Sequence, residues 1–192
     1  MRGSLSDLRR LERARLRERL HGVDIVVFQR VAEFHSPLLD RTLPPPSEAA
    51  SYSRIWRDLT RVDQRRDRQR RRAAIAGMAA VAATSAVANI AMKQTTRRRR
   101  PDRAVPEQRR LEQPSSSSFP SGHAASAAAF SGVIGREIPQ LSLPVNVLAA
   151  TVAFSRVYTG VHYPGDVLAG WLLGRSVAAV ACRGLRRFEP SR

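Results

Sequence analysis

Residues 73–92 have the sequence AAIAGMAAVAATSAVANIAM, twenty consecutive positions without a charged side chain. A helix rises about 1.5 Å per residue, so this segment would be about 30 Å long, the thickness of a bilayer's hydrocarbon core. Its many alanines make it weakly apolar, and a buried helix in a soluble bundle is the alternative. We interpret it as a transmembrane helix, which places the protein in the all-α class.

Three further apolar segments follow it along the chain. Residues 121–134, 144–154 and 164–182 are rich in alanine and glycine, small residues that let helices approach closely in a bilayer. The charged stretch 57–72 should not span, because arginine at a bilayer centre costs roughly 2.5 kcal/mol or more. We therefore predict a transmembrane helical bundle with about four core helices.

The N-terminal region has a different character. Residues 1–20 interleave leucine with arginine at roughly helical spacing, which predicts a basic amphipathic helix lying on anionic headgroups or on the protein. Residues 23–34 are apolar but too short and too polar to span, and they predict an interfacial or packing helix. The resulting division is a basic N-terminal region, a charged juxtamembrane helix or linker, and a catalytic domain: residues 1–46, 47–72 and 73–187.

The charge balance points to an anionic partner. Thirty-three Lys and Arg residues against sixteen Asp and Glu give a net charge of +17, which suits nucleic acid, an anionic membrane or a phosphorylated substrate. No nucleic-acid recognition motif accompanies the arginines, which disfavours the first. The single cysteine, Cys182, excludes an internal disulfide. Lys93 is the only lysine, in a composition that otherwise uses arginine throughout.

Three clusters of residues carry chemistry. They are Lys93 with Arg100 and Pro101, then Pro120-Ser121-Gly122-His123, then Ser155-Arg156 with His162 and Asp166. The guanidinium groups of Arg100 and Arg156 match phosphate oxygens in a bidentate way, and a glycine at a helix start lets the backbone approach an anion. Two histidines beside such an anion can divide the work, one attacking phosphorus and the other protonating the leaving oxygen.

The expected topology brings these clusters together. If the arginine run before Ala73 lies in the cytoplasm, following the positive-inside tendency, each cluster emerges on the outer face. An Asp166 carboxylate that accepts a bond from one ring nitrogen of His162 would leave the other nitrogen free to react. This topology predicts a multi-pass protein of the cell (inner) membrane with an extracytoplasmic active site.

The spacings Lys93-x6-Arg100-Pro101, Pro120-Ser121-Gly122-His123 and Ser155-Arg156-x5-His162-x3-Asp166 resemble the three signature motifs of the type 2 phosphatidic acid phosphatase and haloperoxidase superfamily. The resemblance covers about residues 73–184. This chain differs from the family in one respect: membrane members usually have about six spanning helices, whereas about four are predicted here.

The resemblance implies a role for each matched residue. His162 would be the nucleophile, Asp166 its orienting partner and His123 the general acid. The phosphoryl oxygens would be held by Lys93, Arg100, Arg156, Ser121 and Gly122. Neither a metal nor another cofactor is implied, because these cations would supply the charge that Mg²⁺ supplies in other phosphoryl-transfer sites. We interpret Arg97 to Arg99 as facing headgroups or solvent, and Ser115 to Ser118 as an approach to the second motif.

The sequence thus predicts a membrane phosphatase that hydrolyses a lipid phosphate monoester or a polyprenyl (di)phosphate through a phosphohistidine intermediate. Its expected partners are the lipid phosphate and an anionic membrane, without nucleic acid, and homo-oligomerisation is left open. Two alternatives stay open as well. One is a vanadate-dependent haloperoxidase, because vanadate mimics phosphate. The other is a non-catalytic basic protein that binds membranes or nucleic acid.

Overall fold

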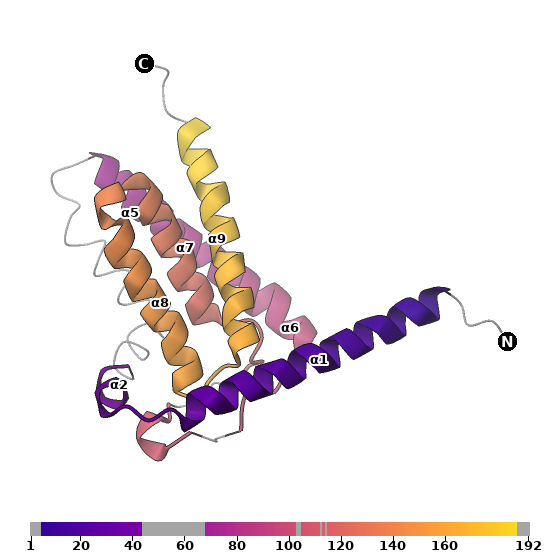
Figure 1. The fold of residues 1–192 in the computed structure, drawn as a ribbon. Coiled ribbons are helices and arrows are strands. Elements are labelled where there is room, and N and C mark those ends of the chain that lie inside the picture. Colours follow the sequence, from indigo (N-terminus) through magenta and orange to yellow (C-terminus); the bar gives the residue numbers. More distant parts are fainter. Residues whose placement is uncertain (1–4, 44–67, 103–104, 112, 114, 188–192) are drawn as a thin grey trace.

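The structure of the protein is a computed structural model that describes residues 5–43, 68–102, 105–111, 113 and 115–187. These residues contain helices and no strand. Four helices run side by side as a bundle (Figure 1): α5 (Arg68–Ala86), α7 (Gly122–Glu137), α8 (Ser142–Tyr158) and α9 (Pro164–Arg187). The predicted all-α bundle with four core helices is confirmed, whereas the helix predicted after residue 47 lies largely outside the described residues.

The uncharged segment 73–92 belongs to a longer helical rod. After α5 the chain continues through a π-helical turn, η1 (Val87–Met92), and a short helix, α6 (Lys93–Thr96). In the described part of the chain, three segments are long and apolar enough to cross a membrane: Arg68–Ile90, Pro139–Tyr158 and Pro164–Arg187. The fourth core helix, α7, has only 16 residues, so length and composition support three spans where the sequence predicted four.

Helix α7 forms the centre of the bundle. The Ser121 side chain caps its first turn by accepting a hydrogen bond from the amide of Ala124. Each residue from Ala124 to Ile134 is buried, and α5, α8 and α9 all pack against this helix. Most of these residues are alanine, serine or glycine. Small side chains let three neighbouring helices surround one helix at short distance.

The contact between α7 and α9 depends on glycine. Gly170 and Gly174 lie four residues apart on one face of α9, with Ala178 one turn further. A Cβ atom on Gly170 would collide with the carbonyl oxygen of Ser121, and one on Gly174 with the carbonyl oxygen of Ala125. The two backbones therefore touch, which fixes the height of α9 relative to the start of α7.

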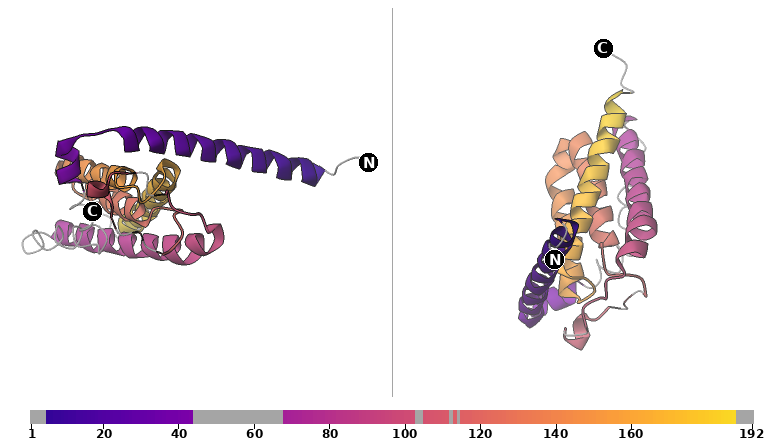
Figure 2. Two further views of the ribbon diagram at one scale, coloured as in Figure 1. Left: turned by 90° about the horizontal axis from the view of Figure 1, so that it is seen from below. Right: turned by 90° about the vertical axis from the view of Figure 1, so that its right-hand side faces the viewer.

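The N-terminal region lies across one end of this bundle. Helix α1 (Leu5–Glu33) combines both predicted N-terminal helices in one helix of 29 residues, and α2 (Pro37–Thr42) follows it. Figures 1 and 2 show α1 beside the first turn of α9, with its N-terminal half extending beyond the bundle. Its leucines at 11, 16 and 20 are exposed, and its basic and apolar residues are not separated into two clear faces.

An ion pair between a buried guanidinium and a partly exposed carboxylate fastens α2 to the bundle. Arg109 belongs to the 3-10 helix η2 (Glu107–Arg109), is fully buried, and its Nε atom lies 2.6 Å from Oδ1 of Asp40. The Tyr158 hydroxyl donates to the same oxygen at 2.5 Å, and the Arg109 guanidinium lies 4.3 Å from the centre of the Tyr158 ring. This network joins α2, η2 and the end of α8.

Because the backbones of α7 and α9 touch at Gly174, we expect a single added methyl group there to destabilise the fold. Overpacking costs roughly 1–3 kcal/mol, so Gly174→Ala should lower the Tm of the detergent-solubilised protein by several degrees. Gly184→Ala on the same helix is the matched control, since a Cβ there meets no atom within 4 Å. Equal Tm values for the two variants would contradict the proposed packing.

Candidate active site

Backbone hydrogen bonds bring the second and third motifs together at the bundle end crossed by α1. The amide of Ser121, which caps α7, donates to the carbonyl oxygen of Asp166 in the first turn of α9 at 2.9 Å. The amide of His162 donates to the carbonyl oxygen of Arg156 at 3.0 Å, which folds the α8–α9 loop back onto the end of α8. The position of each motif is therefore set by main-chain contacts.

The first motif joins them through the loop after α6. The carbonyl oxygen of Arg98 accepts the amide of Ser118 at 2.8 Å, and Arg97 turns the chain at the end of α6 with a left-handed backbone (φ 43°). Residues from three distant parts of the sequence thus meet around His162, as the topological argument predicts.

His162 presents one ring nitrogen to the first motif. Its side chain is nearly fully buried, and its Nε2 atom lies 3.3 Å from Nη1 of Arg100. A guanidinium has no acceptor, so Nε2 must be the acceptor in this contact and the ring proton must reside on Nδ1. The lone pair of Nε2 therefore points toward a positive group, and a phosphoryl group could take this place only if the Arg100 side chain turned aside.

The other ring nitrogen faces Asp166. The Nδ1 atom of His162 lies 3.7 Å from Oδ2 of Asp166, longer than a hydrogen bond, and has no hydrogen-bond partner among the described residues. The Asp166 carboxylate is fully buried and accepts hydrogen bonds from the Ser118 hydroxyl and, at 3.0 Å, from the amide of Tyr163. A shift of less than 1 Å would close the His162–Asp166 bond that the sequence predicts.

The surroundings of His162 keep its ring neutral. The pKa of His162 is lowered to about 4: burial is the largest cause, Asp166 opposes it, and the nearby charges of Arg156 and Arg100 act in the same direction as burial. Because the pKa lies below its usual range, the imidazole holds no positive charge at neutral pH. A neutral ring keeps the Nε2 lone pair available for attack on an electrophile.

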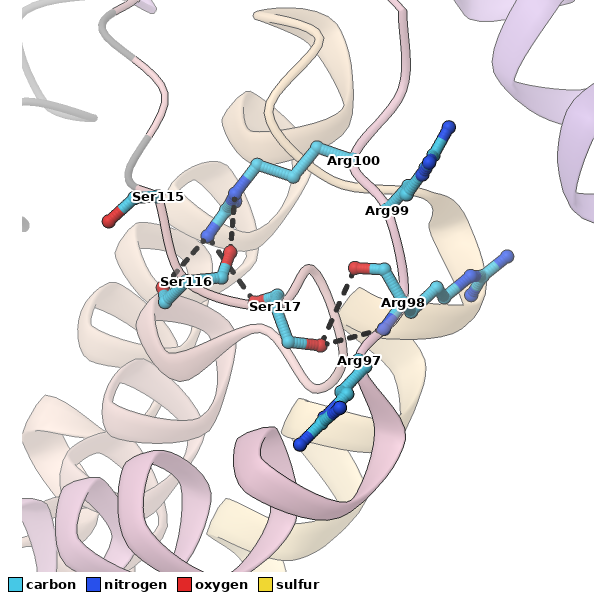
Figure 3. Close-up of a pocket in the computed structure, with 7 residues that line it drawn as sticks. All are labelled: Arg97, Arg98, Arg99, Arg100, Ser115, Ser116 and Ser117. Carbon is cyan, nitrogen blue, oxygen red and sulfur yellow. Dashed lines mark hydrogen bonds between the residues drawn. The ribbon is translucent and has the colours of Figure 1, made fainter.

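Arg100 lies between His162 and an open cavity. Its guanidinium donates to the carbonyl oxygens of Val161 and Ser116 at 3.0 and 3.2 Å, and burial lowers its pKa. Figure 3 shows its side chain pointing toward Ser116 and Ser117, while Arg99 points away from them. The cavity has a volume of about 430 Å³ and is lined by residues 97–100 and 115–117. Its four arginines make the cavity basic, which suits a phosphorylated headgroup.

The remaining predicted residues occupy the same end of the bundle. Arg156 is almost completely buried at the end of α8, and its charge acts on His162. His123 is half-buried in the first turn of α7. A Cβ atom on the preceding residue, Gly122, would meet only Oδ1 of Asn89, at 3.9 Å. The backbone of Lys93 begins α6, and its side chain lies outside the described structure.

The comparison with known families identifies the bundle. A family model described as the PAP2 superfamily matches residues 73–189, well over half of the chain. The protein belongs to the PAP2 superfamily. The matched region begins at α5 and contains all three motifs, so the predicted resemblance is confirmed.

Curated PAP2 relatives carry names of phosphatases. The chain is 43% identical over 91 residues to the decaprenylphosphoryl-5-phosphoribose phosphatase of Mycobacterium tuberculosis, covering 47% of this chain and 50% of that one. It is 40% identical over 97 residues to the phosphatidylglycerophosphatase B of Bacillus subtilis, covering 45% of each. The chain thus spans about half the length of the curated relatives it matches.

Solved structures share the fold. A transmembrane PAP2-type phosphatidylglycerolphosphate phosphatase from Bacillus subtilis superposes with a TM-score of 0.72 at 23% identity, covering 90% of this chain and 89% of that one. Aquifex aeolicus LpxE gives a TM-score of 0.65 at 22% identity, covering 83% and 94%. Together with the three segments that can cross a membrane, these likenesses indicate a membrane protein.

Arg98 is the main residue of this PAP2 site that the sequence argument missed. We expected Arg97 to Arg99 to face headgroups or solvent, but Nη1 of Arg98 lies 2.7 Å from Oδ1 of Asp166. Its Nη2 atom lies 2.7 Å from Oδ2 of Asp24 on α1, and its guanidinium stacks 4.5 Å from the centre of the Tyr163 ring. No periodicity in a run of four arginines could single out this one.

Ser118 is the second residue that was missed. We interpreted the serine run as an approach to the second motif, yet Ser118 is fully buried and its hydroxyl donates to Oδ2 of Asp166. Together with the Tyr163 amide and Arg98, it holds the carboxylate in place. Among the described residues, no group of three or more His, Cys, Asp or Glu side chains is placed to hold a metal ion.

The burial of His162 predicts its titration behaviour. In detergent-solubilised protein, the ring should stay neutral as the pH falls to 5 and become protonated only near pH 4, since its pKa lies below the usual range. NMR of protein labelled at histidine measures this directly, with the signal assigned by its loss in His162→Gln. A midpoint near 6.5 would contradict the described environment.

Proposed function

We propose that the protein is a membrane phosphatase that hydrolyses a lipid phosphate monoester or a polyprenyl (di)phosphate through a phosphohistidine intermediate. One observation carries the proposal: His162 is a buried, neutral histidine whose Nε2 lone pair faces the guanidinium of Arg100 beside a basic cavity. A nucleophile of this kind needs a tetrahedral anion in front of it, and the surrounding cations would hold one there.

In the first half of the reaction, the Nε2 lone pair of His162 attacks phosphorus and forms a P–N bond. The bond between phosphorus and the lipid oxygen breaks, and its electron pair stays with that oxygen. Protonated His123 donates its proton to the departing oxygen, so a neutral alcohol leaves. The Nδ1 proton of His162 can then bond to Asp166, which stabilises the positive charge on the ring.

In the second half, water attacks the phosphohistidine. His123, now neutral, accepts a proton from the water while the new P–O bond forms. The P–N bond breaks, its electron pair returns to Nε2 of His162, and inorganic phosphate leaves. Both halves use the same two histidines with their roles exchanged, as microscopic reversibility requires.

The cations of the site would hold the phosphoryl oxygens. Arg100 and Arg156 lie close enough to His162 to lower its pKa, so an anion at Nε2 would feel both charges. The amide groups at the start of α7, next to Ser121 and Gly122, offer further donors. We assign Lys93 to the same set because it begins the first motif. This arrangement supplies the electrostatic stabilisation without requiring a metal ion.

The substrate class is supported by the relatives. The Mycobacterium tuberculosis protein is named for a decaprenylphosphoryl sugar phosphate, and the Bacillus subtilis protein for phosphatidylglycerophosphate. A relative from Sulfolobus acidocaldarius is named an undecaprenyl-diphosphatase. It is 42% identical over 62 residues, which cover 32% of this chain and 30% of that one. All three names describe phosphate on a lipid, which favours hydrolysis over halide oxidation and over a non-catalytic role.

The charge distribution supports the orientation of the protein. The first residues of α5, which include the exposed Arg71, and the last turn of α9, which includes the exposed Arg186, lie at the bundle end opposite the start of α9 (Figure 1). The positive-inside tendency then places that end in the cytoplasm and His162 on the extracytoplasmic side of the cell (inner) membrane. The proposed orientation rests on these arginines of α5 and α9, because the basic helix α1 lies at the His162 end and would contact headgroups of the extracytoplasmic leaflet.

The proposed mechanism predicts the effect of removing the nucleophile. His162→Ala should lower turnover of a lipid phosphate by more than about a thousandfold, because the P–N bond cannot form. Phosphate release from purified protein measures this, with His35→Ala as the control at an exposed histidine. Wild-type turnover should survive EDTA and be inhibited by vanadate. Undiminished turnover in His162→Ala would remove the mechanism.

The hydrogen bond from Ser118 to Asp166 leads us to expect a smaller loss of activity when Ser118 is replaced. Ser118→Ala removes one donor from the Asp166 carboxylate, so kcat should fall about tenfold while the protein stays folded. Ser131→Ala is the matched control, because Ser131 is also fully buried and donates only to the carbonyl oxygen of Ala128 in α7. Equal kcat values for the two variants would show that the Ser118 bond does not help to orient Asp166.

A further inference from the structure

Helix α1 reaches the active site through one acidic side chain. Asp24 lies in the second half of α1, where this helix crosses the first turn of α9, and its side chain is only 13% exposed. Its two carboxylate oxygens serve different partners. Oδ1 accepts the amide of Gly165 at 2.6 Å, and Oδ2 lies 2.7 Å from Nη2 of Arg98.

The bond to Gly165 supports the start of α9. The first amides of a helix have no acceptor within that helix. Asp24, on a different helix, supplies the acceptor for one such amide of α9. A Cβ atom on Gly165 would lie 2.6 Å from Oδ2 of Asp24, so any other residue here would displace this carboxylate. The next residue is Asp166. Asp24 therefore holds the backbone directly beside the carboxylate that faces His162.

The bond to Arg98 changes the charge beside His162. The Arg98 guanidinium lies between two carboxylates, 2.7 Å from an oxygen of Asp166 and 2.7 Å from an oxygen of Asp24. Arg98 alone would cancel the charge of Asp166. With Asp24 present, the three groups together carry one negative charge. That charge opposes Arg100 and Arg156 on the other side of the ring and favours the cationic form that His162 takes in the proposed reaction.

Aromatic packing keeps this part of α1 in place. Tyr163, next to His162, contacts the ring of Phe28 edge-on at 5.6 Å and the ring of His21 at 5.7 Å. Phe28 is 4% exposed, although most apolar residues of α1 are exposed. The His21 Nδ1 atom also lies 3.0 Å from Nη2 of Arg98. The second half of α1 thus covers the loop that carries His162.

We propose that Asp24 is a positioning residue of the active site, which acts through Arg98 and Gly165 to hold Asp166 and to keep a net negative charge beside His162. The inference rests on the proposed phosphatase function. It makes α1 part of the active site as well as a basic surface helix.

The test compares two acids on the same helix. Asp24→Asn keeps an acceptor oxygen for the Gly165 amide but removes the charge, so kcat for phosphate release should fall about tenfold to a hundredfold with KM nearly unchanged. Glu18→Gln is the matched control, because Glu18 is exposed on α1 and loses the same charge. Wild-type kcat in Asp24→Asn, or an equal loss in Glu18→Gln, would overturn the proposal.

A second measurement separates charge from packing. The NMR midpoint of His162 should fall by at least about 0.5 pH unit in Asp24→Asn and stay in place in Glu18→Gln, because one negative charge has left its surroundings. Asp24→Glu, which retains the charge, should keep the wild-type midpoint and recover most of the lost kcat. An unchanged midpoint in Asp24→Asn would overturn the proposal. Asp24→Ser replaces Asp24→Asn in both measurements if the latter does not fold.

The two hypotheses fail in different ways. If the wild-type protein releases no phosphate from any lipid tested and matches His162→Ala, the proposed function is wrong, while the titration of His162 still reports on Asp24. If the wild type is active and Asp24→Asn equals it in kcat and midpoint, the phosphatase proposal stands and the role of Asp24 is refuted.

Discussion

The hydrogen bond from the Ser121 amide to the Asp166 carbonyl oxygen joins the starts of two helices, and the geometry around His162 depends on it. Helix starts have unsatisfied amides and attract negative charge, so placing two of them side by side creates a region suited to anions. The approach is close because Gly170 and Gly174 allow the backbones of α7 and α9 to touch. Packing in the middle of the bundle thereby determines the chemistry at its end.

Burial and the charges of Arg100 and Arg156 act on His162 in one direction, and the charge of Asp166 acts in the other. The ring is buried beside Arg100 and Arg156, and these influences keep it neutral and nucleophilic. Asp166 opposes them from the other side, held by Ser118, the Tyr163 amide and Arg98. A histidine that attacks phosphorus must be uncharged before the attack and must tolerate a positive charge after it. Arg100 and Arg156 on one side keep the ring neutral before the attack, and Asp166 on the other side stabilises its positive charge afterwards.

Much of this arrangement could be predicted from the sequence, and particular residues show where prediction stops. The core helices were predicted from long segments without charged residues and from their content of small residues. The spacing of the third motif predicted that His162 and Asp166 would lie together. Arg98 and Ser118 were missed because runs of identical residues carry no information on side-chain direction. That direction is set by local backbone features such as the left-handed turn at Arg97. Asp24 contacts a loop more than 130 residues away, which no local pattern encodes.

The short length of α7 has a consequence for how the protein meets its bilayer. Sixteen residues extend about 24 Å, less than the roughly 30 Å of a hydrocarbon core, but α7 is enclosed by longer neighbours and does not itself have to match the lipid. The starts of α7 and α9 lie level with each other, so the difference in their lengths falls at the opposite end of the bundle. There the last turns of α9 extend past the end of α7 (Figure 1), so the arginine-bearing end of one helix reaches farthest in that direction.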